Sequence, residues 1–314
     1  MRRFSAACVF SINLLFFALA AMASPIQAAE KYDISDETGA YLDVLEPSGK
    51  PILRYVYLRD TSTGEKDFDT AKVFAHVLAA DGKTTITKGP GGKFPHHRGI
   101  FIGWSKLKHG GKRHDLWHVR NTAQLHQDFL ETAADENGAL VKSLINWIGN
   151  HDEIVLEEIR THRVVAEDDA HAVIDFVSTL KAVNGDVVLD GDPEHAGIQF
   201  RPSQQVAENK SATYVMPEEG IDPREDLDLP WVAGTFKVDG QAWTVQHMNH
   251  PTNPSGARWS AYRDYGRFGP FTVVEIPDGE SQTFRYRFRI TRGEAPSQEQ
   301  FTRHYQRYVD NGVE

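Results

Sequence analysis

Hydrophobic and polar side chains alternate with a period of two along much of this chain. The clearest run is residues 281–291, where one set of alternate positions is apolar and the other is basic. The apolar set is Phe284, Tyr286, Phe288 and Ile290, and the basic set is Arg285, Arg287 and Arg289. Because successive side chains of a β-strand point to opposite faces, this pattern predicts a strand with one face in a core and one in solvent.

Turn sequences separate the alternating runs at short intervals. Asn137-Gly138 and Asn184-Gly185 are typical of tight hairpin turns. About a dozen or more strands are too many for a small immunoglobulin-like sandwich. We therefore predict an all-β fold, a large antiparallel two-sheet sandwich. Only residues 298–311 favour a helix, because their aromatic residues recur at spacings of four and three.

The first 28 residues have the pattern of a secretory signal peptide. Arg2 and Arg3 precede an apolar run at residues 4–22, and small residues follow it. A transmembrane anchor is the alternative, but the run is at the short limit for a span and contains Asn13. We predict a signal peptide at residues 1–28 and a single β-sandwich domain at 29–314. The mature protein is then exported, periplasmic or extracellular, with no membrane span.

Composition narrows the classes of function. The one cysteine, Cys8, lies in the signal, so thiol nucleophiles and cysteine-ligated metal centres are excluded from the mature chain. Loss of Arg2 and Arg3 takes the net charge from −10 to −12. With no compensating basic stretch, that charge argues against nucleic acid as a partner. The partner that we expect is a small-molecule or oligosaccharide substrate.

Residues 91–118 contain five of the 14 histidines, interleaved with arginine, aspartate and tryptophan. Polar residues that follow a Gly-rich turn at a strand end are well placed to line a cleft. We predict His97 as a catalytic group and His96, Arg98 and Trp117 as substrate-binding residues. Trp117 is a candidate sugar-stacking platform, or else a lid on the sheet.

The same stretch contains two candidate metal ligands, His114 and His118. On an extended strand they would share one face but lie roughly 13 Å apart, too far to bind one ion. Only a helical turn would bring them together, as it does for histidines four apart on a helix. Imidazole ligands favour zinc or copper. A divalent metal is therefore the predicted cofactor if that turn forms.

Two later segments have a similar mixture of residues. Glu194 and His195 lie on a turn and are predicted as general acid or base, with Arg201 on the next strand as a substrate-binding residue. The alternative is a charged surface turn. Residues 247–258 form a loop rich in proline and asparagine, which predicts a rigid and polar segment. Its predicted substrate-binding residues are His247, His250, Asn253 and Arg258.

These segments together resemble the secreted bacterial family known as PmoA-like. The matching pieces are Pro95-His96-His97-Arg98-Gly99 with Trp104, residues 115–117, residues 194–201, and His250-Pro251-Thr252-Asn253-Pro254 with Trp259. The resemblance runs across most of the mature chain and implies a protein similar to those of glycan breakdown. The label methane oxygenase, which this family carries, implies a membrane copper enzyme, whereas the mature chain has no apolar span.

A second resemblance concerns the fold. The closing strand, preceded by Pro277-Asp278-Gly279-Glu280, looks like the end of the sugar-binding supersandwich of the galactose-mutarotase-like superfamily. Such an analogy implies a fold and says little about function.

Four hypotheses about function follow. The first is an exported carbohydrate-active enzyme, a hydrolase or lyase of glycans or glycosides, in which histidines transfer protons and arginines bind hydroxyls or a carboxylate. No pair of acidic residues identifies itself as a glycosidase dyad. The second is a zinc or copper enzyme, and the third is a non-catalytic sugar-binding module. The last is a copper oxygenase.

Overall fold

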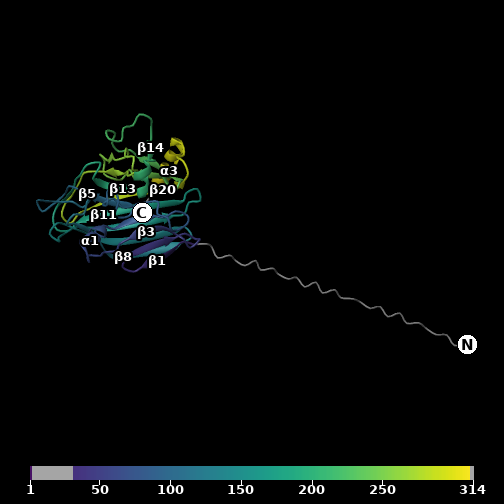
Figure 1. Ribbon diagram of the computed structural model, residues 1–314, viewed down its shortest axis with the longest axis horizontal. Helices are drawn as coiled ribbons and strands as arrows, with labels where there is room; N and C mark the ends of the chain where they lie inside the picture. Colours follow the sequence, from purple (N-terminus) through teal and green to yellow (C-terminus); the bar gives the residue numbers. More distant parts are fainter. Residues whose placement is uncertain (2–30, 312–314) are drawn as a thin grey trace.

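The computed structural model describes Met1 and residues 31–311 (Figure 1). The predicted signal peptide therefore lies, apart from Met1, outside the described residues. Within the described part, no helix has both the length and the hydropathy needed to cross a membrane.

The larger of two main sheets has eight strands, all paired antiparallel. Its spatial order is β14 (Thr213–Val215), β15 (Trp231–Val238), β16 (Gln241–Asn249), β20 (Ser281–Arg292), β11 (Ala172–Ala182), β10 (Ile154–Val165), β9 (Gly138–Ile148) and β8 (Ala123–Asp135). The β8–β9 and β15–β16 pairs are hairpins, and the predicted Asn137-Gly138 turn joins the first of them.

The second main sheet has six strands in the order β1 (Asp33–Glu37), β2 (Tyr41–Leu45), β3 (Pro51–Val56), β4 (Phe74–Val77), β5 (Ile100–Trp104) and β13 (Ala196–Phe200). There are also two short sheets. They are β19 (Val274–Ile276), β12 (Val187–Leu189), β6 (Leu107–His109) and β7 (Lys112–His114), and the pair β17 (Arg258–Trp259) and β18 (Pro270–Phe271). The predicted all-β antiparallel sandwich is confirmed, with these two small sheets in addition.

Side chains from both main sheets form one core. Tyr55 of β3 and Trp104 of β5 belong to the same buried cluster as Trp147 of β9 and Phe284 of β20. The Trp104 ring centre lies 6.0 Å from that of Trp147 and 5.7 Å from that of Phe284. The inner faces of the sheets therefore pack directly on each other.

The predicted C-terminal helix is confirmed as α3 (Gln298–Asp310), which a Ser297/Gln300 capping box begins. Two helices of six residues each, α1 (Gly64–Asp69) and α2 (Gln204–Asn209), were not predicted. Both are too short to show a helical period, and each depends on a cap, Thr63 or Ser203. Figure 1 shows α3 close to β14, at the opposite end of the molecule from β1 and β8.

The prediction for β20 is confirmed for its apolar face and wrong for its basic face. Phe284, Phe288 and Ile290 point into the core as expected. The opposite face is not in solvent, because α3 covers part of it and Tyr308 lies 4.7 Å beneath the Arg287 guanidinium. Arg287 is buried there and binds Asp175 through two hydrogen bonds. A neighbouring helix thus converts a predicted surface into a second buried layer.

A buried carboxylate connects the two main sheets. Glu158 of β10 is fully buried and accepts hydrogen bonds from Trp147 Nε1 (2.7 Å), Ser178 Oγ (2.6 Å) and both Nε and Nη2 of Arg160 (2.8 and 2.7 Å). Arg160 Nη1 also donates to the backbone oxygen of Val73, just before β4. The larger sheet is therefore hydrogen-bonded to the segment that enters the smaller one.

We expect Glu158→Gln to lower the free energy of unfolding by about 3–5 kcal/mol, because it leaves the Arg160 guanidinium buried without its counter-charge. Lys142→Gln, which breaks the exposed Lys142–Glu131 pair on the same sheet, should cost less than about 1 kcal/mol. Urea unfolding followed by tryptophan fluorescence measures both. Equal effects of the two substitutions would contradict the role given to Glu158.

Candidate functional site

The candidate site is built around the pairing of β5 with β13. Ala196 lies opposite Trp104 and Phe200 opposite Ile100. The loop with His96 and His97 enters β5, and the turn with His195 enters β13. These two segments are nearly 100 residues apart in the sequence, and because the strands pair antiparallel they approach the pair from opposite ends.

A third segment, residues 115–119, lies along β5. It forms a turn in which Asp115 Oδ1 accepts hydrogen bonds from the backbone N–H groups of Trp117 (3.2 Å) and His118 (2.9 Å). Gly103 permits the close approach, because a Cβ atom there would lie 2.5 Å from the backbone oxygen of Leu116. A side chain at position 103 would push the turn, and His118 with it, away from β5.

Four of the predicted histidines converge in this site. The ring centre of His96 lies 4.3 Å from that of His97 and 4.4 Å from that of His118. The ring centre of His118 lies 5.2 Å from that of His195. The three sequence segments thus contribute to one cluster, which we call the histidine cluster. His118 and His195 keep 24% and 37% of their side chains exposed, so solvent reaches one side of it.

Two members of the histidine cluster are held by aspartates in the same way. His118 Nδ1 lies 2.8 Å from Asp115 Oδ2, and His195 Nδ1 lies 2.9 Å from Asp192 Oδ1. In each pair Nδ1 donates to the carboxylate, which leaves the Nε2 lone pair available to accept a proton. The site therefore has two oriented groups that can exchange protons.

The other two members are held neutral. Burial, with the positive charge of Lys72 and the neighbouring His118 and His195, lowers the pKa of His96 to about 2. Burial and the nearby Arg267 lower the pKa of His97 well below its ordinary value. Neither ring nitrogen of His97 has a hydrogen-bond partner among the described residues. His97, the predicted catalytic group, is thus a buried neutral imidazole beside the two Asp–His pairs.

Lys72 lies beneath the cluster and was not predicted. It is buried, and its ammonium donates to the backbone oxygens of Trp117 (2.5 Å) and His96 (3.4 Å). Burial, with the charges of Arg98 and Arg160, lowers the pKa of Lys72 well below its usual value. Lys72 therefore joins the two loops that carry His96 and His118.

Two of the three predicted binding residues of the first stretch, Trp117 and Arg98, have structural positions. Trp117 is fully buried, with ring centres of His97 at 5.5 Å and Phe101 at 5.0 Å, so it offers no exposed face to a sugar. Arg98 donates to the backbone oxygens of Phe68 (2.7 Å) and Pro95 (3.2 Å) and fixes the loop before β5.

Three more predicted residues, Glu194, His247 and His250, lie in three different environments. Glu194, beside the cluster in sequence, pairs with Arg263. His247 is enclosed by rings in the core, with Phe288 at 4.2 Å. His250 packs against Tyr308 of α3, its ring centre 5.2 Å away. No ring contact joins either histidine to the histidine cluster in the described part of the chain.

Asn253 and Arg258, the other two predicted residues of this loop, have different positions. Asn253 Oδ1 accepts from the backbone N–H of Arg285 (2.7 Å), and its amide group donates to the backbone oxygen of that residue, so it fixes the loop to β20. Arg258 lines a cleft of about 390 Å³ together with Asp192, the residue that holds His195. Arg258 is therefore the one predicted loop residue next to the site, across the Asp192 turn.

His114 and His118 do not share a site, because His114 ends strand β7 and the turn at residues 115–119 begins after it. The ring of His114 contacts His109, not the cluster. Among the described residues, only His109, His114 and Glu153 bring three ligand atoms within 4.8 Å of one another. However, His114 Nδ1 accepts the backbone N–H of Asn150 (3.1 Å), which leaves the proton on Nε2, the atom that faces Glu153. This arrangement is a hydrogen-bonded cluster rather than a preformed metal centre.

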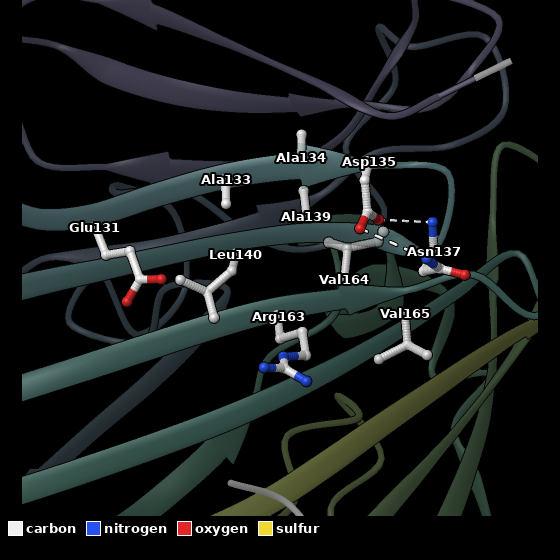
Figure 2. A pocket seen from close by; sticks show the side chains of 11 residues that line it. Glu131, Ala133, Ala134, Asp135, Asn137, Ala139, Leu140, Arg163, Val164 and Val165 are labelled. Atoms are coloured by element: carbon white, nitrogen blue, oxygen red, sulfur yellow. Dashed lines mark hydrogen bonds between the residues drawn. The ribbon is translucent and has the colours of Figure 1, made fainter. Parts of the chain in front are cut away.

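A second cavity, of about 420 Å³, lies away from the histidine cluster. Figure 2 shows its lining on β8, β9, β10 and the β8–β9 turn, where Glu131 and Arg163 are the longest polar side chains and most of the other lining residues are alanine, leucine or valine. The dashed lines are the hydrogen bonds of Asp135 with Asn137 that close the hairpin. No histidine lines this cavity, so it offers no imidazole for proton transfer.

A short motif could have identified two of the residues that sequence reasoning missed, Asp115 and Asp192. Asp115 and Asp192 each precede a histidine of the cluster by three residues, so the pattern Asp-x-x-His occurs at both Asp–His pairs. An aspartate that starts a turn places its carboxylate beside the side chain three residues later. Lys72, Tyr265 and Arg267 give no comparable signal, since only the fold brings them near His97.

A family model matches this chain, but the function of the family is unknown. The model of a family described as "Family of unknown function (DUF6807)" matches residues 44–306. No curated protein matches the sequence. The resemblance to the PmoA-like family is not tested by this match and stays a prediction.

Solved structures resemble the chain only distantly. A heparan sulfate lyase HepC mutant from Pedobacter heparinus is 12% identical, with 86% of this chain and 36% of the lyase covered and a TM-score of 0.37. The Slr1438 protein from Synechocystis sp. PCC 6803 is 11% identical, with 84% and 96% covered and a TM-score of 0.37. The chain spans about a third of the length of the lyase. At such values neither likeness carries an argument about function.

We expect the protein to lose stability as the pH falls below about 6.5, and His97 to cause part of the loss. In the unfolded chain His97 binds a proton below its ordinary pKa, whereas in the folded protein it stays neutral, so protons favour unfolding. His97→Phe keeps an aromatic ring and removes this effect. Between pH 7.5 and 5.0 the variant should lose about 2 kcal/mol less than the wild type.

Urea unfolding at both pH values measures the difference. Phe101→Leu disturbs the same packing without removing a titratable group, so it should keep the pH dependence of the wild type. If His97→Phe also kept it, the neutral state assigned to His97 would be wrong.

Proposed function

We propose, for a chain that belongs to the family of unknown function DUF6807, a carbohydrate-active enzyme that works by histidine-mediated proton transfer. Its two acid–base groups are His118, oriented by Asp115, and His195, oriented by Asp192. The export predicted from the N-terminal sequence belongs to the same proposal, and so does a glycan or glycoside as substrate, which the resemblance to proteins of glycan breakdown supports.

The observation that carries the proposal is the facing pair of Asp–His units. Their ring centres are 5.2 Å apart, and each presents an Nε2 atom whose ring is fixed by a carboxylate. Cleavage of a glycosidic bond needs one group to remove a proton and another to protonate the leaving oxygen. An imidazole can take either part, because its Nε2 atom accepts a proton in the neutral form and donates one in the protonated form.

The surrounding charges suit one of the two reactions in this proposal. The buried Lys72 side chain and Arg267 guanidinium lie close enough to His96 and His97 to lower the pKa of both. Fixed positive groups stabilise the negative charge that develops when a lyase removes a proton from carbon, whereas hydrolysis of a glycoside develops positive charge on the sugar. The neutral His97 can donate or accept a hydrogen bond to the substrate without adding charge.

The same residues would serve a hydrolase or a lyase. In a hydrolase the neutral imidazole activates water, and in a lyase it removes a proton from carbon. The non-catalytic binding module remains the alternative, because exposed histidines can also hydrogen-bond to sugar hydroxyls. It does not account for two matched Asp–His pairs, which binding of a neutral sugar does not need.

We expect His118→Ala and His195→Ala each to lower kcat at least about 100-fold on any glycan that the wild type cleaves, because each removes one proton-transfer group. Asp192→Asn should lower kcat less, since it removes only the group that orients His195. His151→Ala, an exposed histidine outside the cluster, is the matched control.

The measurement is a screen of plant and bacterial polysaccharides with two readouts. New reducing ends without ultraviolet absorbance identify a hydrolase, and an absorbing unsaturated product identifies a lyase. If the wild type bound a glycan without cleaving it, and His118→Ala bound it equally well, the enzyme proposal would be wrong and the binding module correct.

A further inference from the structure

Two buried arginines of this protein, Arg160 and Arg287, are each paired with a carboxylate through one edge of the guanidinium group. Arg160 binds both oxygens of Glu158 through Nε and Nη2. Arg287 binds both oxygens of Asp175 through the same two atoms. That edge presents two parallel N–H groups, which match the spacing of the oxygens of a carboxylate.

Three buried cations around His97 have no such partner. Lys72, Arg201 and Arg267 are at most 2% exposed, and none forms an ion pair within residues 31–311. Arg267 donates only to neutral oxygens, of Gln199 (2.8 Å) and Ser260 (3.0 Å) among them.

Arg201 is the least satisfied of the three. Its Nη1 donates to the backbone oxygen of Tyr265, whereas Nε and Nη2 have no hydrogen-bond partner in the described part of the chain. These are the two atoms with which Arg160 and Arg287 bind their carboxylates. The edge that pairs with an acid elsewhere is thus unpaired here.

The unpaired edge of Arg201 lies near His97 of the histidine cluster. The Arg201 guanidinium lies 4.9 Å from the ring centre of Tyr265, whose ring stacks on His97 at 6.3 Å. Its charge is near enough to lower the pKa of His97. His97 and Trp117 Nε1 are also buried polar groups without partners among the described residues.

The two acids of the histidine cluster are already engaged. Asp115 and Asp192 accept hydrogen bonds from His118 and His195, and neither forms an ion pair with a buried cation. A buried charge without a counter-charge is costly, and neutral hydrogen-bond partners do not remove that cost. A negatively charged ligand would satisfy both the charge and the donors.

We propose that the Nε–Nη2 edge of Arg201 binds the carboxylate of an acidic sugar, a uronate unit of the substrate. This inference rests on the proposed function, because it places the carboxylate on the His97 side of the histidine cluster. Arg267 supplies further positive charge close to His97. The planar two-oxygen match favours a carboxylate over a sulfate ester.

Binding of simple ligands tests the inference without a known substrate. We expect isothermal titration calorimetry at low ionic strength to detect D-glucuronate or D-galacturonate with the wild type, and to detect neither methyl ester. Arg201→Met should weaken uronate binding on the order of tenfold to a hundredfold, as loss of a charged hydrogen-bonded pair does. Arg303→Met, on the exposed face of α3, should leave binding unchanged.

Thermal unfolding without ligand separates a binding role from a structural one. Arg201→Met removes an unpaired charge and should melt at the wild-type temperature or above it. Arg160→Met leaves Glu158 buried and unpaired and should melt clearly lower. The inference is overturned if Arg201→Met binds uronate like the wild type or is destabilised like Arg160→Met. Inorganic sulfate that binds as tightly as the uronates would also overturn the carboxylate assignment.

The outcomes also separate this inference from the proposed function. If the enzyme proposal fails alone, uronates still bind and Arg201→Met still weakens them, although no glycan is cleaved. If the inference fails alone, the wild type cleaves a neutral glycan and Arg201→Met retains that activity.

Discussion

The buried carboxylate of Glu158 is the interaction on which the rest of this structure depends. It receives hydrogen bonds from Trp147, Ser178 and Arg160, which come from three adjacent strands of the larger sheet. Because Arg160 also binds the backbone of Val73, the network fixes the chain just ahead of β4. Lys72 is the preceding residue, and it holds the two loops of the histidine cluster. A charge pair in the core therefore determines where the functional groups can meet.

The same local arrangement orients both acid–base groups. An aspartate begins a turn and its carboxylate binds the imidazole three residues later, once before β13 and once beside β5. Each unit orients one imidazole without help from the rest of the fold. The fold contributes the distance between them, through the pairing of β5 with β13 and the close approach at Gly103.

Burial divides the histidines of this chain into two kinds. His162 and His247 are enclosed by aromatic rings in the core, and burial lowers the pKa of both. His118 and His195 have an acidic partner and a solvent-exposed side. His97 is buried like the first kind, yet it lies next to the second kind and to Arg201. Residue type alone does not distinguish the two kinds, because all five residues named here are histidines on or next to predicted strands.

The sequence by itself determined the fold class, the C-terminal helix and the positions of His96, His97, His118 and His195 as candidates, because alternation, spacing and local residue mixtures are properties of neighbouring residues. It placed His247 in the site although the fold places it in the core, and it expected the arginines of β20 to face solvent. Only the tertiary structure decided which candidates converge, that Trp117 is buried, and that Lys72, Arg201 and Arg267 surround His97. Those facts depend on strand order and on burial, and the free energy of a charge or an imidazole is set by neighbours that lie far away in the sequence.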